Sequence, residues 1–141
     1  MGNRLKKALQ ALGLVLVITL ACLAFMPWRM GDVIQDVGSA NRCMVLRYDQ
    51  NYSIAYPQAE QLEEVKGALA DATGTFDRNR EGLVYWGEEP MYRIYLWTDD
   101  GRISDIWLCG PAIYYDGSQY ALGEASASKL NDALAECFSN K

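Results

Sequence analysis

The first hydrophobic positions of the chain form one continuous run, from Ala8 to Met26. These 19 residues include no charged side chain. As a helix they would span roughly 28 Å, close to the hydrocarbon core of a bilayer, which is about 30 Å thick. Arg4, Lys6 and Lys7 precede the run, so the bias of basic residues places the N-terminus in the cytoplasm and the remaining chain outside. The pattern predicts a single-pass membrane anchor over residues 8–26.

Two other interpretations of residues 1–26 stay open. A cleaved signal peptide normally has a shorter apolar region and a pair of small residues after it. Here the best such pair, Cys22 and Ala24, lies inside the run. Alternatively, Leu20-Ala21-Cys22 is similar to the end of a bacterial lipobox, with Cys22 as the lipidated residue, although Thr19 and Leu20 depart from the preferred types. The length of the run favours a retained anchor.

After the run the pattern becomes polar and rich in small residues. Gly31, Asp32 and Asp36 are typical of a solvated segment, so residues 27–42 are expected to be a linker. Residues 43–141 then form one extracytoplasmic domain, because about 100 residues suffice for one hydrophobic core and not for two.

Within this domain, strand-like and helix-like patterns alternate, which predicts an α+β fold. Leu62, Val65 and Leu69 recur at helical spacing after Pro57, and a second apolar stripe closes the chain. That closing stripe consists of Ala127, Leu130, Leu134 and Cys137. Residues 73–82 are expected to be a polar loop. Two strands are expected at 43–48 and 52–56. An antiparallel meander of about five strands, packed with the two helices, then covers 83–86, 91–98, 102–109, 112–115 and 119–122.

The turn Asp99-Asp100-Gly101 fixes the register of the best-defined hairpin. A three-residue loop with glycine in the left-handed conformation is a common connection between antiparallel strands. This loop places three pairs on one face: Ile94 with Ile106, Tyr92 with Leu108, and Leu96 with Ser104. The residues between them must then point to the opposite face.

That opposite face carries the most interesting candidate site. Arg93 is expected opposite Trp107, as a cation–π pair, and Tyr95 opposite Asp105. Such a surface can bind a partner protein, a second copy of the chain, a peptide or a glycan. The alternative is that a helix covers this face and makes it core. The candidate binding residues are Arg93, Tyr95, Trp97, Asp105, Trp107 and Tyr114.

Composition narrows the chemistry further. The chain has no histidine, which excludes Ser-His-Asp and Cys-His catalysis and histidine-based zinc sites. Beyond the basic N-terminus 10 basic residues face 18 acidic ones, a balance that argues against nucleic acid or anionic lipid as a partner. The adjacent pairs Glu88 with Glu89 and Asp99 with Asp100 lie in expected turns, where carboxylates are solvated rather than tuned for acid–base work. No cofactor motif or metal-binding spacing is present, so no cofactor and no metal are expected, and an enzyme is not the favoured class.

Three cysteines follow the hydrophobic run: Cys43, Cys109 and Cys137. In an oxidising exterior one disulfide is expected among them, with one thiol left over. The spacing does not select the pair. The alternative is that all three are small buried apolar residues.

In segment order the chain resembles small bacterial membrane-anchored or lipoprotein-type exported domains of unknown function. The residues that carry this resemblance belong to the hairpins: Ile106, Leu108, Gly110, Ile113, Tyr115, Gly117, Tyr120 and Leu122. The resemblance implies an exported domain and supplies no catalytic residues. Together the observations lead us to expect a non-catalytic interaction or sensory domain of the bacterial cell envelope. The alternative is a lipoprotein-like module that binds an envelope glycan or peptide.

Overall fold

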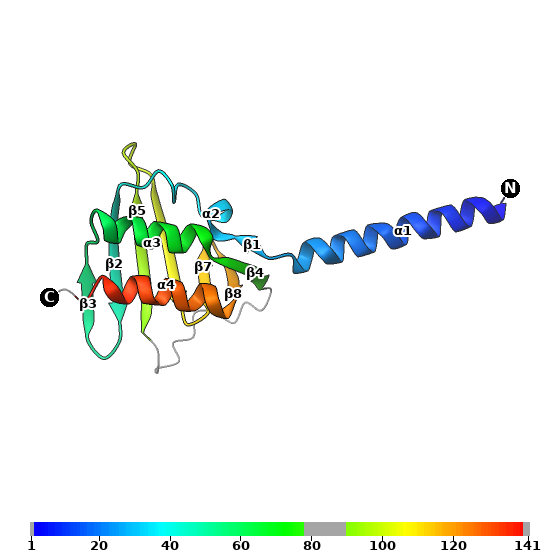
Figure 1. Ribbon diagram of the computed structural model, residues 1–141. Helices are drawn as coiled ribbons and strands as arrows, with labels where there is room; N and C mark the ends of the chain where they lie inside the picture. Colours follow the sequence, from blue (N-terminus) through cyan, green and yellow to red (C-terminus); the bar gives the residue numbers. More distant parts are fainter. Residues whose placement is uncertain (1, 78–89, 140–141) are drawn as a thin grey trace.

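The N-terminal apolar run forms a single helix. In the computed structural model, which describes residues 2–77 and 90–139, helix α1 covers Gly2–Phe25 and projects away from the rest of the molecule (Figure 1). None of its residues is buried, and it is long and apolar enough to cross a membrane. The hydroxyl of Thr19 donates to the carbonyl oxygen of Val15 at 2.8 Å, so this polar group is satisfied within the helix.

The remaining described residues build an antiparallel sheet with helices, which confirms the α+β class. The sheet has eight strands in these residues, more than the expected five-stranded meander, in the order β1-β4-β8-β7-β6-β5-β2-β3. The strands are β1 Trp28–Arg29, β2 Arg42–Tyr48, β3 Tyr52–Ala55, β4 Thr73–Asp77, β5 Met91–Trp97, β6 Ile103–Cys109, β7 Ala112–Tyr115 and β8 Ser118–Leu122.

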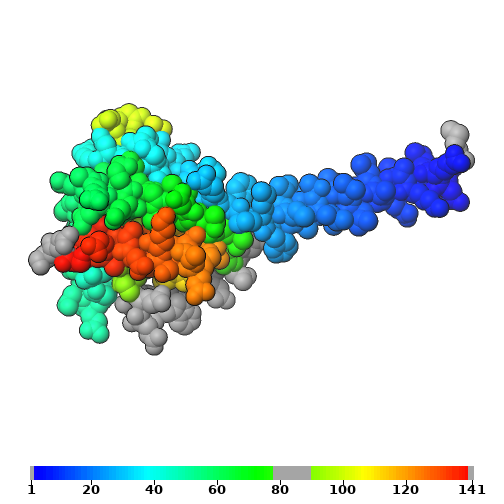
Figure 2. Space-filling view, viewed as in Figure 1, coloured from blue at the N-terminus to red at the C-terminus, as the bar shows by residue number. Residues whose placement is uncertain are grey.

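Three helices lie on one face of this sheet, and α3 and α4 run across it side by side (Figures 1 and 2). They are α2 Met30–Val33, α3 Glu60–Asp71 and α4 Glu124–Glu136. As the spacing predicts, α3 buries Leu62, Val65 and Leu69. Helix α4 buries Leu130 and Leu134 in the same way.

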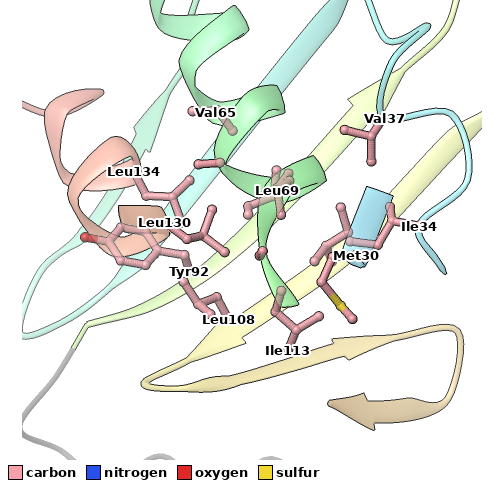
Figure 3. Packing of buried hydrophobic residues seen from close by; sticks show 14 of the residues in the cluster. Met30, Ile34, Val37, Val65, Leu69, Tyr92, Leu108, Ile113, Leu130 and Leu134 are labelled. Carbon is pink, nitrogen blue, oxygen red and sulfur yellow. The ribbon is translucent and has the colours of Figure 1, made fainter. Parts of the chain in front are cut away.

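The core fills the space between these helices and the sheet. Burial alternates strictly along β5 and β6, so that Ile94 and Ile106 are fully buried while their neighbours are half-buried. Tyr92 and Leu108 meet Leu130 and Leu134 in the same cluster (Figure 3). Each such side chain stabilises the fold by about 1.5–3 kcal/mol through removal of apolar area from water.

Residues 27–42, which the sequence led us to expect as a linker, are packed into the domain. Met30, Ile34, Val37 and Ala40 are each at most 3% exposed. Strand β1 pairs with β4, and the amide of Met30 donates to the carbonyl of Ala72 at 2.8 Å. The apolar residues recur every three or four positions, but the polar and small residues between them obscure this pattern. The folded domain therefore begins at β1, immediately after α1.

The expected polar loop at 73–82 also differs. Its first half is strand β4, which pairs with β8 from Gly74 opposite Leu122 to Asp77 opposite Gln119. A Cβ at Gly74 would lie 3.1 Å from the side chain of Leu122, so the glycine serves close packing rather than a turn. The rest of this segment and the expected strand at 83–86 lie outside the described residues.

Candidate interaction surface

The hairpin of β5 and β6 has the expected register. Ile94 lies opposite Ile106, Tyr92 opposite Leu108 and Leu96 opposite Ser104. Gly101 adopts a φ of 84°, which supplies the left-handed position that the three-residue loop requires. All six side chains are buried towards the helices, so the alternate positions of both strands face the other way.

In the part of the chain that the structure describes, all three domain helices lie on the first face, and none covers the second. The predicted binding residues all belong to this second face, and each is half-buried because its neighbours on the sheet flank it. One aromatic residue from β2, Tyr48, joins them. We call the set the aromatic face: Tyr48, Arg93, Tyr95, Trp97, Asp105, Trp107 and Tyr114.

Arg93 is the centre of the aromatic face. Its guanidinium carbon lies 4.4 Å from the ring centre of Trp107, the predicted cation–π partner, and 4.8 Å from that of Tyr95. The same guanidinium binds Asp105 through two hydrogen bonds, from Nε to Oδ1 at 3.0 Å and from Nη2 to Oδ2 at 2.7 Å. Asp105 lies diagonally across the strand pair, opposite Tyr95. These hydrogen bonds raise the pKa of Arg93 further above its ordinary value.

Tyr48 was missed from the sequence. Its ring stacks on Trp107 with a centroid distance of 5.8 Å and an interplanar angle of 15°, and Tyr52 lies 5.4 Å away on its other side. The contact arises because β2 inserts beside β5, with Leu46 opposite Arg93. The alternation of Met44, Leu46 and Tyr48 could have shown that these residues share a face, but not which strand they lie against.

The aromatic rings continue along the face on both sides of Arg93. Tyr95 and Trp97 are 5.8 Å apart between ring centres, and Tyr114 is the β7 partner of Trp107. Burial raises the pKa of the Tyr95 and Tyr114 hydroxyls, so both remain neutral hydrogen-bonding groups near neutral pH.

A hollow of about 510 Å³ opens at one end of the aromatic face. It exists because β6 extends beyond β7: Ile106 pairs with Tyr115, whereas Ile103 to Asp105 continue past the end of β7. Ile103 is 58% exposed there. The walls of the hollow are Gln35, Ile103, Ser104, Asp105, Trp107, Tyr114, Tyr115, Asp116 and Gly117.

The expected disulfide is not formed: no bond joins Cys43, Cys109 and Cys137, all of which lie in the described residues. Cys43 is buried, and burial raises its pKa to about 12; the same cause raises that of Cys137 to about 11. Cys137 lies near Cys43 on the helix side, whereas Cys109 is half-buried on the opposite side of the sheet. The alternative of buried, apolar cysteines therefore describes Cys43 best. Cys22 is exposed on α1, and its lipidation remains a prediction.

The candidate carboxylates have structural contacts. Asp100 accepts hydrogen bonds from Thr98 and Arg102, and these partners hold its pKa below the ordinary value. Asp99 accepts from Asn41. Glu88 and Glu89 lie outside the described residues. A carboxylate with a lowered pKa stays ionised, which is unsuited to a general acid at neutral pH.

Within residues 2–77 and 90–139, no three histidine, cysteine, aspartate or glutamate side chains come close enough together to hold a metal ion. Comparisons of the chain with protein-family models, curated proteins and solved structures find no match. The aromatic face is therefore interpreted from its own geometry.

Proposed function

We propose that this protein is a membrane-anchored interaction domain that binds another protein of the bacterial cell envelope through the aromatic face. The observation that carries the proposal is the row of aromatic rings around the Arg93–Asp105 ion pair, on a sheet face that no described helix covers. The domain would lie outside the cytoplasm, since Arg4, Lys6 and Lys7 precede the apolar helix.

The anchor is supported by the exposure of α1. Its leucine, valine and isoleucine side chains are more than half exposed, and in water such a surface would associate or aggregate. A bilayer removes that apolar surface from water and needs no contact with the domain. A retained helix, rather than a cleaved signal or a lipid on Cys22, is part of the proposal.

The aromatic face has the composition of an interface centre. Tryptophan, tyrosine and arginine are enriched among the few residues that dominate the binding energy of protein–protein interfaces. Here the side chains of Arg93 and Asp105 are 30% and 40% exposed. They are already paired with each other, so a partner that covers them does not have to bury an unpaired charge. The rings that flank Arg93 are held in place before binding, which lowers the entropy lost on association.

The hollow beside Ile103 favours a second candidate, the binding of a glycan or a peptide. Its volume of about 510 Å³ falls in the range of small-molecule sites. Trp107 and Tyr114 offer ring faces, and Asp105 offers a carboxylate beside them. A ligand of this kind would occupy one end of the aromatic face rather than its whole length.

A photo-crosslinking experiment tests the leading proposal. The full-length protein carries p-benzoylphenylalanine in place of Ile103, at the exposed end of the face, and is irradiated in native membranes. The matched control carries it in place of Asp132, which is exposed on α4, on the opposite face of the sheet. We expect one protein to crosslink to position 103 and not to position 132.

Trp107→Ala in the same protein then removes the central ring. We expect it to abolish the crosslink while far-UV circular dichroism stays unchanged, because Trp107 is half-buried and points away from the core. If the variant unfolds, the face is structural and the proposal fails. A crosslink between two copies of the chain would identify the partner as a homodimer. Retention of a defined oligosaccharide or peptide with no protein crosslink would favour the second candidate.

A further inference from the structure

The edge of the domain nearest to α1 carries exposed aromatic side chains. Trp28 in β1 is 46% exposed and Phe76 in β4 is 38% exposed. Phe76 meets Tyr120 of β8 edge to face, with ring centres 5.9 Å apart. These residues play no part in the aromatic face, because Phe76 and Tyr120 point to the helix side of the sheet.

These side chains lie at the level of the last turn of α1. Leu23 and Ala24 of that turn line a hollow of about 370 Å³ together with Trp28, Phe76 and Tyr120. Asp32 and Val33 complete its wall. Residues far apart in the sequence are thus gathered around the point where the apolar helix meets the domain, as Figure 1 shows for α1, β1 and β4.

The connection between the helix and the domain is short. Only Met26 and Pro27 separate α1 from β1, and two extended residues reach no further than about 7 Å. Proline also restricts the backbone at this point. The domain therefore cannot move away from a bilayer in which α1 ends.

We propose that Trp28, Phe76 and Tyr120 form a docking surface for the bilayer interface, which holds the β1–β4 edge of the sheet against the lipid headgroups. The inference rests on the membrane anchor of the proposed function. Trp28 and Tyr120 each have one apolar and one polar end, as do the aromatic side chains that collect at this depth of a membrane, and Phe76 adds apolar area beside them. Arg29 and Lys129 flank the same edge, each about 60% exposed, but both lie within 3.5 Å of Asp71, so the edge is not basic and the docking rests on its aromatic side chains.

Quenching by brominated lipid tests this orientation in the full-length protein. The protein is reconstituted into vesicles of phosphatidylcholine with a minor fraction of phosphatidylglycerol, whose acyl chains are brominated near the headgroup. An NBD fluorophore is attached to a cysteine placed at Phe76 or Tyr120, in a background with Cys22→Ala, Cys109→Ala and Cys137→Ala. Cys43 stays unlabelled because its side chain is buried and burial raises the pKa of its thiol.

Two labelled positions serve as controls. The native Cys22, inside α1, reports insertion of the helix, and a cysteine at Tyr56, on β3's side of the domain, reports a site far from the bilayer. We expect quenching and a blue-shifted emission at positions 76, 120 and 22, and neither at position 56. Quenching at Cys22 without quenching at 76 and 120 would overturn the docking surface and leave the anchor intact. Absence of quenching at all positions would refute the anchor, and the docking surface with it.

Discussion

The packing of the segment after α1 leads to a quantitative prediction for Ile34→Ala. Ile34 is 1% exposed and lies in the same core cluster as Met30 and Val37. Truncation of a fully buried isoleucine to alanine costs about 2–5 kcal/mol, since the lost contacts and the cavity both count. A domain of this size is typically stable by about 5–15 kcal/mol, so the substitution removes a large share of its stability.

Urea unfolding of the full-length protein in detergent micelles, followed by tryptophan fluorescence, measures this loss. With a slope of about 2 kcal/mol per molar urea, the midpoint should fall by roughly 1–2.5 M while the slope stays constant. The matched control is Gln35→Ala. The Gln35 side chain is exposed, and its backbone hydrogen bonds survive the change. In these bonds the Gln35 amide donates to the Tyr115 hydroxyl at 3.1 Å, and the Ser104 hydroxyl donates to the Gln35 carbonyl at 2.8 Å. Equal midpoints for Ile34→Ala and Gln35→Ala would refute the assignment of residues 30–40 to the core.

Three further predictions follow from other contacts. Gly31→Ala should destabilise the domain by about 1–3 kcal/mol in the same urea assay, because the new Cβ would lie 2.9 Å from the carbonyl oxygen of Ala70 in the last turn of α3. Gly38→Ala is the control and should change stability little, because no atom lies within 4 Å of a Cβ there. The thiol of Cys43 should resist alkylation at pH 8 until the protein unfolds. Its folded pKa of about 12 exceeds the unfolded value of about 8.5, so the stabilisation from the neutral thiol should be complete below pH 8.5 and decline as the pH rises towards 12. Cys43→Ala should remove this pH dependence. A double-mutant cycle of Arg93→Met and Asp105→Asn should give a coupling of only about 1 kcal/mol, since both side chains are partly exposed, and a coupling above about 3 kcal/mol would show that the pair is effectively buried.

The sequence predicted best those elements whose pattern is local. The α1 run, the α3 and α4 stripes and the β5–β6 register each depend on residues within about 20 positions of one another. The hairpin register in particular followed from one turn, and it placed Arg93 against Trp107 as the structure has them. Local spacing is sufficient there because a turn fixes which residues of adjacent strands can meet.

The parts that sequence could not predict depend on long-range pairing. Strand β2 lies beside β5, so Tyr48 reaches Trp107 across 59 positions of sequence, and no turn specifies that contact. Strand β4 is polar and short, and only its place between β1 and β8 makes it a strand. The cysteines show the same limit, because Cys43 lies beside Leu62 of α3 and near Cys137, both far from it in the sequence.

The two proposals together constrain where a partner can bind. With the β1–β4 edge at the bilayer, the sheet rises from the membrane in the order β1-β4-β8-β7-β6-β5-β2-β3. Adjacent strands lie about 4.8 Å apart, so β7, which carries Tyr114 and is three strands beyond β1, lies roughly 14 Å from that edge, and β2 roughly 29 Å. The aromatic face would then lie well above the lipid headgroups, which excludes transmembrane helices from its range of contact. We therefore expect its partner to present an extramembrane domain or loop at this height. A crosslink from position 103 to a membrane-embedded segment would contradict the orientation.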